Sequence, residues 1–147
     1  MSAKTDTWEE GLIRLLFLNT DFTLVGDAGG LRGSVSAGSL YFSLHTADPT
    51  DTGSQTSSET SYTNYARQAV TRGAGFSITT PDTISPAADI DFPECGATPG
   101  GAITHFGLGT DLSGAGKLLY YGAVTPNITM AQGVIPRLKS TSTIVEA

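Results

Sequence analysis

Cysteine is almost absent from this sequence, since Cys95 is the only one among 147 residues. A single thiol cannot close an intramolecular disulfide, which argues against a small secreted scaffold held together by such bonds. The N-terminal residues also lack the basic stretch followed by an apolar stretch that marks a signal peptide. We therefore expect a protein that folds in a reducing cytosol.

Long apolar runs and positive charge are scarce as well. The longest apolar run, residues 15–18, is far shorter than the ~20 residues that a membrane helix needs. Lys and Arg together number 8 and are scattered, against 14 Asp and Glu, which gives a formal charge of −6. Neutralisation of phosphates by basic side chains dominates affinity for nucleic acid. We expect neither nucleic acid nor a membrane as a partner.

The residues that are plentiful favour strands and turns. Glycine occurs 18 times and proline 7 times, while only 15% of the residues are charged. Several short runs alternate apolar and polar residues, as half-buried strands do, and glycine-rich turns separate the later runs. The expected strands are residues 40–45, 65–71, 76–79, 89–92, 103–109, 117–124 and 142–145. This pattern predicts an all-β fold, a jelly-roll-like sandwich or barrel, with one N-terminal α-helix.

The expected helix lies near the N-terminus. Thr7 is followed three positions later by Glu10, which is the spacing of a capping box. Apolar residues at helical spacing follow, among them Trp8, Leu12, Leu15 and Leu16. We expect the stretch Asn19-Thr20-Asp21 to end the helix, and the helix to contact a neighbouring subunit or the capsid. Packing of the helix on its own domain is the alternative.

The chain reads as a single domain made of a helix and arm, residues 1–39, and a β-sandwich, residues 40–147. Residues 46–61 of the second part show no hydrophobic periodicity. Loops beyond about 12–15 residues in a compact domain are usually functional or disordered. Pro49 sets its own φ and restricts Asp48, so the two fix a turn at the start of this segment. We interpret the segment as a reaching loop that becomes ordered on contact with a neighbour.

Signals for catalysis and metal binding are weak. His45 and His105 are the only histidines, and no Gly-x-Ser-x-Gly elbow is present. The parts from which a hydrolytic triad would have to be built are Ser43, His45, Asp48, His105 and Asp111. Any serine-rich chain supplies such a set by chance, and the acidic stretch 48–53 departs from the calcium-loop pattern. We expect no catalytic residue, no cofactor and no metal, and interpret His45 and Asp48 as architectural residues at a strand-to-loop corner.

Four stretches together resemble a known family. They are LHTADP (44–49), ETSYTNYAR (59–67), ITHFGLGT (103–110) and LLYYG (118–122). Through them the chain resembles, from about residue 40 to residue 124, a group of small virion proteins of tailed bacteriophages. Members are labelled head decoration (capsid cement) proteins, tail-fibre proteins or minor tail proteins. The resemblance implies a β-rich, jelly-roll-like domain that works by assembly and not by turnover.

The function that we predict is therefore that of a virion structural protein, assembled in the host cytoplasm, that binds the outside of the capsid lattice and stabilises the head. Its expected partners are the major capsid protein and further copies of itself, in a dimer or trimer. One alternative is a tail-fibre or minor tail component that binds host glycan through Tyr120 or Tyr121 and the acidic loop. Another is a virion-associated hydrolase.

The candidate interface residues combine the helix, the loop and one strand face. Tyr65 and Arg67 would share one face of the strand expected at residues 65–71, and both residue types are enriched at interfaces. The full set is Trp8, Leu12, Leu16, His45, Asp48, Tyr65, Arg67 and Tyr121.

Overall fold

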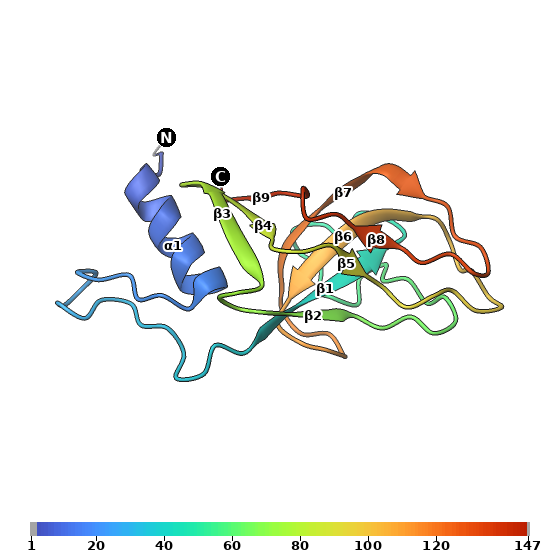
Figure 1. Ribbon diagram of the computed structural model, residues 1–147, viewed down its shortest axis with the longest axis horizontal. Helices are drawn as coiled ribbons and strands as arrows, with labels where there is room; N and C mark the ends of the chain where they lie inside the picture. The colour runs from blue at the N-terminus through green and yellow to red at the C-terminus, as the bar shows by residue number, and fades with distance from the viewer. Residues whose placement is uncertain (1–2, 147) are drawn as a thin grey trace. The chain divides into compact units, whose positions relative to one another are not determined.

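The computed structural model describes residues 3–146, which form two compact units (Figure 1). Unit 1 consists of residues 3–39, 70–89 and 139–146, and unit 2 of residues 40–69 and 90–138. Within these residues the protein is mainly β-sheet with one short helix, as the sequence predicted, and the sheets do not close into a barrel. The predicted division after residue 39 coincides with a unit boundary, but two later segments return to unit 1. The outermost residues of the predicted parts, 1–2 and 147, lie outside the described residues.

Unit 1 contains α1 (Asp6–Leu18), whose ends are set by local hydrogen bonds. The hydroxyl of Thr5 accepts from the backbone N–H of Trp8 at 3.4 Å and caps the N-terminus. The prediction that Thr7 caps the helix is wrong, because Thr5 already does so and Thr7 lies within the first turn. Asn19 adopts the left-handed conformation, with φ 57°, and ends the helix where the sequence predicted.

The core of unit 1 joins α1 to a small sheet. The sheet consists, in this order, of β3 (Phe76–Thr80), β4 (Thr83–Pro86) and β9 (Ile144–Val145), and its pairs are antiparallel. Phe17 and Ile13 are the buried residues of α1. The ring of Phe17 meets that of Phe76 edge to face, with centroids 5.0 Å apart. Ile84 lies opposite Ile144 across the β4–β9 pair, and both are buried.

Arg72 ties the end of α1 to the arm, residues 19–38. Its guanidinium donates to the carbonyl oxygens of Leu15 and Leu16 and, at 3.1 Å, to that of Ala37. The carbonyls of a last helical turn have no partner inside the helix and carry partial negative charge. A half-buried cation therefore stabilises the end of the helix, and its burial lowers the pKa of Arg72.

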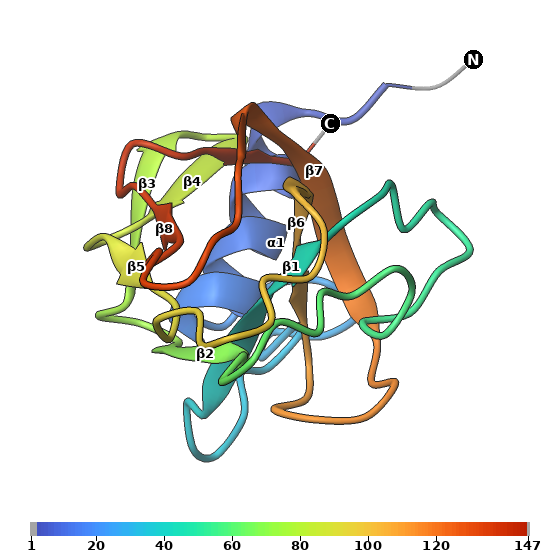
Figure 2. The ribbon, with the colours of Figure 1, turned by 90° about the vertical axis from the view of Figure 1, so that its right-hand side faces the viewer.

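Most of the four-stranded sheet lies in unit 2. Its order is β2-β1-β6-β7, and its strands are β1 (Ser39–His45), β2 (Gln68–Thr71), β6 (Ile103–Gly109) and β7 (Leu118–Ile128). A separate two-stranded sheet pairs β5 (Ile90–Asp91) with β8 (Arg137–Leu138). In the antiparallel β1–β6 pair, Phe42 lies opposite Leu108 and Leu44 opposite Phe106. These apolar side chains share one face of the sheet, whose strands β1, β6 and β7 can be followed in Figure 2.

The predicted strands are mostly present, with shifted ends. β6 has the predicted bounds, β1 begins at Ser39, and β7 continues to Ile128. The sequence did not predict β4 or β8, which are short and contain or follow a proline, Pro86 and Pro136 respectively. Proline removes a ladder donor and made both stretches look like loops.

One predicted strand is wrong in its first half. β2 begins at Gln68, so Tyr65 and Arg67 are not on a strand face. Both side chains bind the carboxylate of Glu59, which holds their segment in a loop.

Candidate functional site

The face of the sheet opposite the apolar side chains carries small and polar residues. Ser43 of β1 lies opposite Gly107 of β6, and His45 lies opposite His105. A Cβ added at Gly107 would lie 2.6 Å from both Nε2 of His45 and Oγ of Ser43. Heavy atoms that are not bonded do not approach so closely, so the two polar side chains need a glycine beneath them.

His45 joins this face to the loop of residues 46–61. Its Nε2 lies 2.8 Å from Oγ of Ser43, and its Nδ1 lies 2.8 Å from the carbonyl oxygen of Ser57. A carbonyl oxygen only accepts, so Nδ1 carries the hydrogen and Nε2 accepts from the Ser43 hydroxyl. Burial lowers the pKa of His45, which favours this neutral form.

Ser43 and His45 have the spacing of a hydrolase nucleophile and base, but both side chains are 0% exposed. The carboxylate of Asp48 accepts from the backbone N–H of Thr50 at 2.8 Å, which closes a turn at the surface. A substrate has to reach the nucleophilic oxygen, and a fully buried hydroxyl offers no surface for that. Within residues 3–146, no group of three His, Cys, Asp or Glu side chains is placed to hold a metal ion.

A buried ion pair holds the far end of the same loop. Nε and Nη2 of Arg67 donate to the two carboxylate oxygens of Glu59, both at 2.7 Å, in a bidentate geometry. The Arg67 side chain is 3% exposed and that of Glu59 15%. The hydroxyl of Tyr65 donates to Glu59 at 2.8 Å and accepts from the backbone N–H of Leu44 at 3.1 Å. The hydrogen bond to Glu59 raises the pKa of Arg67, so the guanidinium stays charged. Through Glu59 and Tyr65 it links the loop to β1.

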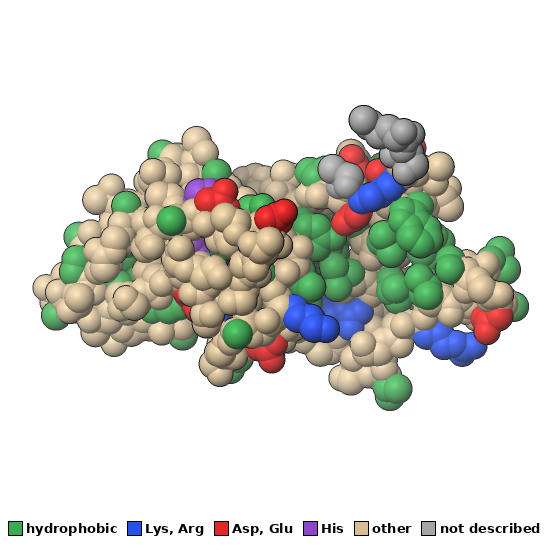
Figure 3. All heavy atoms as spheres, turned by 180° about the vertical axis from the view of Figure 1, so that it is seen from behind, with side chains coloured by type: hydrophobic (Ala, Val, Ile, Leu, Met, Phe, Trp, Pro, Cys, Tyr) green, Lys and Arg blue, Asp and Glu red, His purple; other side chains and the backbone are tan. Residues whose placement is uncertain are grey.

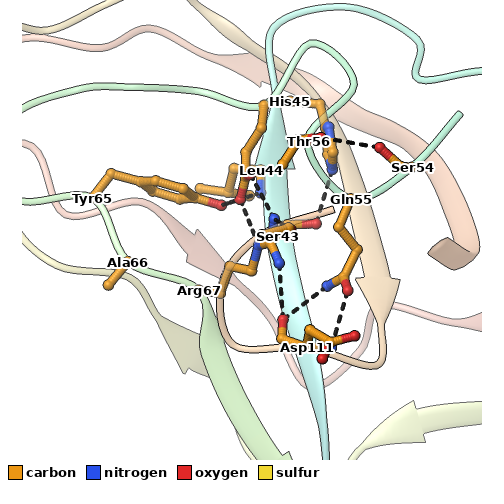
Figure 4. Close-up of polar contacts among 12 residues, drawn as sticks. Ser43, Leu44, His45, Ser54, Gln55, Thr56, Tyr65, Ala66, Arg67 and Asp111 are labelled. Carbon is orange, nitrogen blue, oxygen red and sulfur yellow. Dashed lines mark hydrogen bonds and ion pairs between the residues drawn. The ribbon is translucent and has the colours of Figure 1, made fainter. Parts of the chain in front are cut away.

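Arg67 also binds the loop between β6 and β7, residues 110–117. Its Nη1 donates to the carbonyl oxygen of Asp111 at 2.9 Å and its Nη2 to that of Gly114 at 2.8 Å. The side-chain amide of Gln55 donates to the carbonyl of Asp111 at 3.2 Å and accepts from its N–H at 3.0 Å. Figure 4 shows Gln55 and Arg67 converging on Asp111. Two buried side chains thus fix the backbone of an exposed loop.

Two glycines give Gln55 the space that it occupies. A Cβ at Gly109 would lie 2.2 Å from Cδ of Gln55, and a Cβ at Gly116 would lie 2.1 Å from its Oε1. The glycine-rich stretches of this hairpin therefore do more than turn the chain, because they let a long amide side chain lie under it.

We call Ser43, His45, Gln55, Glu59, Tyr65 and Arg67 the polar network. It holds residues 46–61 and 110–117 against β1 and β6. The interpretation of residues 46–61 as a reaching loop that becomes ordered on contact with a neighbour is wrong. Gln55 in their middle is fully buried, and the N–H of Thr46 donates to the carbonyl oxygen of Ser58 at 2.9 Å. The loop is ordered by its own contacts.

The predicted interface residues lie in different places. In unit 2, His45, Tyr65 and Arg67 meet in the polar network, where His45 and Arg67 have almost no exposed surface for a direct contact. Asp48 is exposed at the start of the loop, and Tyr121 is exposed on β7. Their role at an interface stays a prediction.

The remaining candidates lie on α1 in unit 1. Trp8 is 39% exposed and packs against the ring of Phe22 in the arm, with centroids 5.5 Å apart. Leu12 and Leu16 are half-buried. The interface role of this stripe also stays a prediction.

Sequence reasoning did not assign a role to Gln55, Glu59 or Asp111. The sequence did contain a signal for Glu59. It is one of only three charged residues in positions 46–61, and it stands eight positions before Arg67. Charged side chains are almost never fully buried unless they are paired. No local signal marks Gln55, whose partner lies 56 positions away.

The predicted absence of nucleic-acid and membrane partners stays a prediction. Two observations are relevant to it, the distribution of charge on the surface and the character of the helix. On the face shown in Figure 3, acidic and basic side chains are scattered among polar ones without a continuous basic stripe. In the part of the chain that the structure describes, no helix has both the length and the apolar character that a membrane span requires.

Comparison with known proteins finds one family. Residues 30–146, well over half of the 147, match the model of a family described as podophage GP4 fiber I protein gp80. The match includes every residue of the polar network. A search of curated proteins finds no match.

Proposed function

Because the chain belongs to the podophage GP4 fiber I protein gp80 family, we propose that it is a fibre component of a bacteriophage virion. It acts by binding and not by catalysis. The family name supports a fibre-related virion protein, which was the alternative function predicted from the sequence. The head-decoration role predicted first stays a competing prediction, and the copy number in the virion decides between the two.

The observation that carries a binding role is the fixed loop of residues 110–117. Arg67 and Gln55 hold its backbone from beneath, so a partner that docks on it does not have to order it. Leu112 stands in this loop with 59% of its surface exposed. A large apolar side chain on a rigid, exposed loop gains free energy when a partner covers it.

Copy number tests the place of the protein in the virion. Quantitative mass spectrometry of purified virions measures its ratio to the major capsid protein. A fibre component is present at a copy number far below that of the capsid protein. A copy number comparable to that of the capsid protein overturns the fibre assignment and supports a lattice-wide decoration protein.

A pair of variants tests the loop. Phage that carry Leu112→Asp should incorporate the protein poorly or adsorb poorly to the host, because a charge replaces the apolar contact. The matched control is Ile135→Asp, which changes a residue of the same unit with a similar exposure of 52%. Equal behaviour of the two variants contradicts a contact role for residues 110–117.

Host-glycan binding is a finer form of the fibre function. The sequence prediction named Tyr120 or Tyr121 and the acidic loop. Tyr120 is half-buried, while the side chains of Tyr121 and Asp48 are exposed. Binding of the purified protein to a glycan array, lost in Tyr121→Ala, supports it, and the absence of any bound glycan counts against it.

The proposal that the protein does not catalyse a reaction has its own test. The burial of Ser43 and His45 supports this proposal, because neither side chain has exposed surface. Hydrolysis of ester or glycoside substrates by the purified protein, abolished in Ser43→Ala, overturns this part of the proposal.

A further inference from the structure

β7 is the last strand in the order β2-β1-β6-β7, so one of its edges pairs with β6 and the other faces away from the sheet (Figures 1 and 2). With 11 residues it is the longest strand in residues 3–146, and no strand of that range pairs with its outer edge. The backbone N–H and C=O groups along such an edge are a template for another strand. The edge itself therefore specifies the chemistry of its partner, an extended segment of polypeptide.

Two of the devices by which proteins usually block such pairing, charged side chains and short length, are absent from this edge. The other common devices are proline and β-bulges. No residue from Leu118 to Ile128 is charged. The other edge strand, β2, is only 4 residues long and is followed at once by Arg72. Pro126 lacks an N–H, and the register between β6 and β7 shifts beside it and again near Leu119, which leaves residues 120–123 as the regular stretch for pairing.

The absence of charge on β7 allows a second copy of this chain to be the partner. The formal charge of −6 makes two copies repel each other over much of their surface. The uncharged edge of β7 is a place where two copies meet without setting like charges opposite each other.

The side chains of β7 also suit antiparallel pairing with themselves. A two-fold axis at Gly122 places Tyr121 of one copy opposite Ala123 of the other, and both residues lie in the regular stretch of the strand. Tyr121, 39% exposed in the single chain, then lies over a small side chain of the second copy. Cross-strand pairs of this kind stabilise sheets.

We propose that β7 is a dimerisation edge, at which two copies join their four-stranded sheets into one continuous sheet. The interface is isologous, because the same strand contributes on both sides. Each β7 has one free edge, so the assembly closes at two copies. The pairing needs only β7, so it can form whether the protein belongs to a fibre or to a head. The test of dimerisation is therefore independent of the test of the fibre assignment.

A charge placed on this edge tests the proposal. Ala123 is exposed on β7, and Ala123→Lys places one added charge in each copy near the two-fold axis. We expect the dimer Kd, measured by sedimentation over a wide range of concentration, to rise about tenfold or more. The matched control is Ala69→Lys, which adds the same charge at an exposed position of β2 and should leave the Kd unchanged.

Hydrogen exchange of the unaltered protein gives a result that does not depend on how a variant folds. Amides of residues 120–123 should exchange more slowly at high than at low protein concentration, while those of β3 should not change. A monomer at all concentrations, a trimer, equal effects of Ala123→Lys and Ala69→Lys, or exchange of β7 independent of concentration would each overturn the proposal.

Discussion

Replacing Arg67 with methionine tests whether the polar network holds unit 2 together. The Arg67→Met variant leaves the Glu59 carboxylate 15% exposed and without its bidentate donor. Removal of one partner of a buried ion pair costs ~3–5 kcal/mol, because an uncompensated charge stays buried. Tyr65 still donates to Glu59, so we expect the free energy of unfolding to fall by about 3 kcal/mol, the lower end of this range. The carbonyls of Asp111 and Gly114 add little, since these residues are exposed and water can replace the lost donor.

Thermal and urea denaturation measure this loss. In a protein of this size each kcal/mol lowers Tm by about 2–4 °C, so Arg67→Met should melt roughly 6–12 °C below the unaltered protein. The matched control is Arg137→Met. It breaks the ion pair with Asp91, whose partners are 53% and 48% exposed. Exposed pairs contribute ~0–1 kcal/mol, so the control should lose little stability.

The double variant tests whether the loss of stability comes from the unpaired charge of Glu59. Glu59→Gln combined with Arg67→Met removes both charges, so no unpaired charge stays buried, and part of the stability should return. Equal losses in Arg67→Met and Arg137→Met, or no recovery in the double variant, would refute the reasoning that a buried charge pair holds these loops.

Three further changes test local parts of the structure. Gly107→Ala should cost about 1–3 kcal/mol in urea denaturation, because the added methyl group overpacks His45. Stability should fall as the pH drops below about 6.5, since the unfolded chain then binds a proton at His45 whose folded pKa is lowered. His45→Gln should flatten that part of the stability profile. Thr5→Ala should cost about 0.5–2 kcal/mol as a lost helix cap, and Thr7→Ala much less, in the same denaturation assay.

The β6 and β2 stretches show why some strands were predictable and others were not. Residues 103–109 are bounded by turn residues and formed a strand with the predicted bounds. Residues 65–67 lead directly into β2 and begin with a tyrosine, a residue type that favours strands, yet they lie in a loop. The difference is Glu59, whose carboxylate binds Tyr65 and Arg67 and is not visible in the local pattern.

The candidate site was only partly predictable for the same reason. His45 and Arg67 stood out as rare chemistry-bearing residues in a chain with few charges. Gln55 did not, because its importance depends on the loop at Asp111 far along the chain. The glycines at positions 107, 109 and 116 looked like turn residues, and only the fold shows that they make room for buried polar side chains.

The sequence by itself determined the all-β class, the single N-terminal helix and the stretch at residues 19–21 in which that helix ends. These follow from alternation, helical spacing and capping, which act between residues close in the chain. Tertiary structure alone decided that residues 46–61 pack down instead of reaching out, that Arg67 is buried, and that β7 is left as a long uncharged edge. Each of these depends on contacts between segments distant in the sequence, whose register and pairing no local pattern specifies.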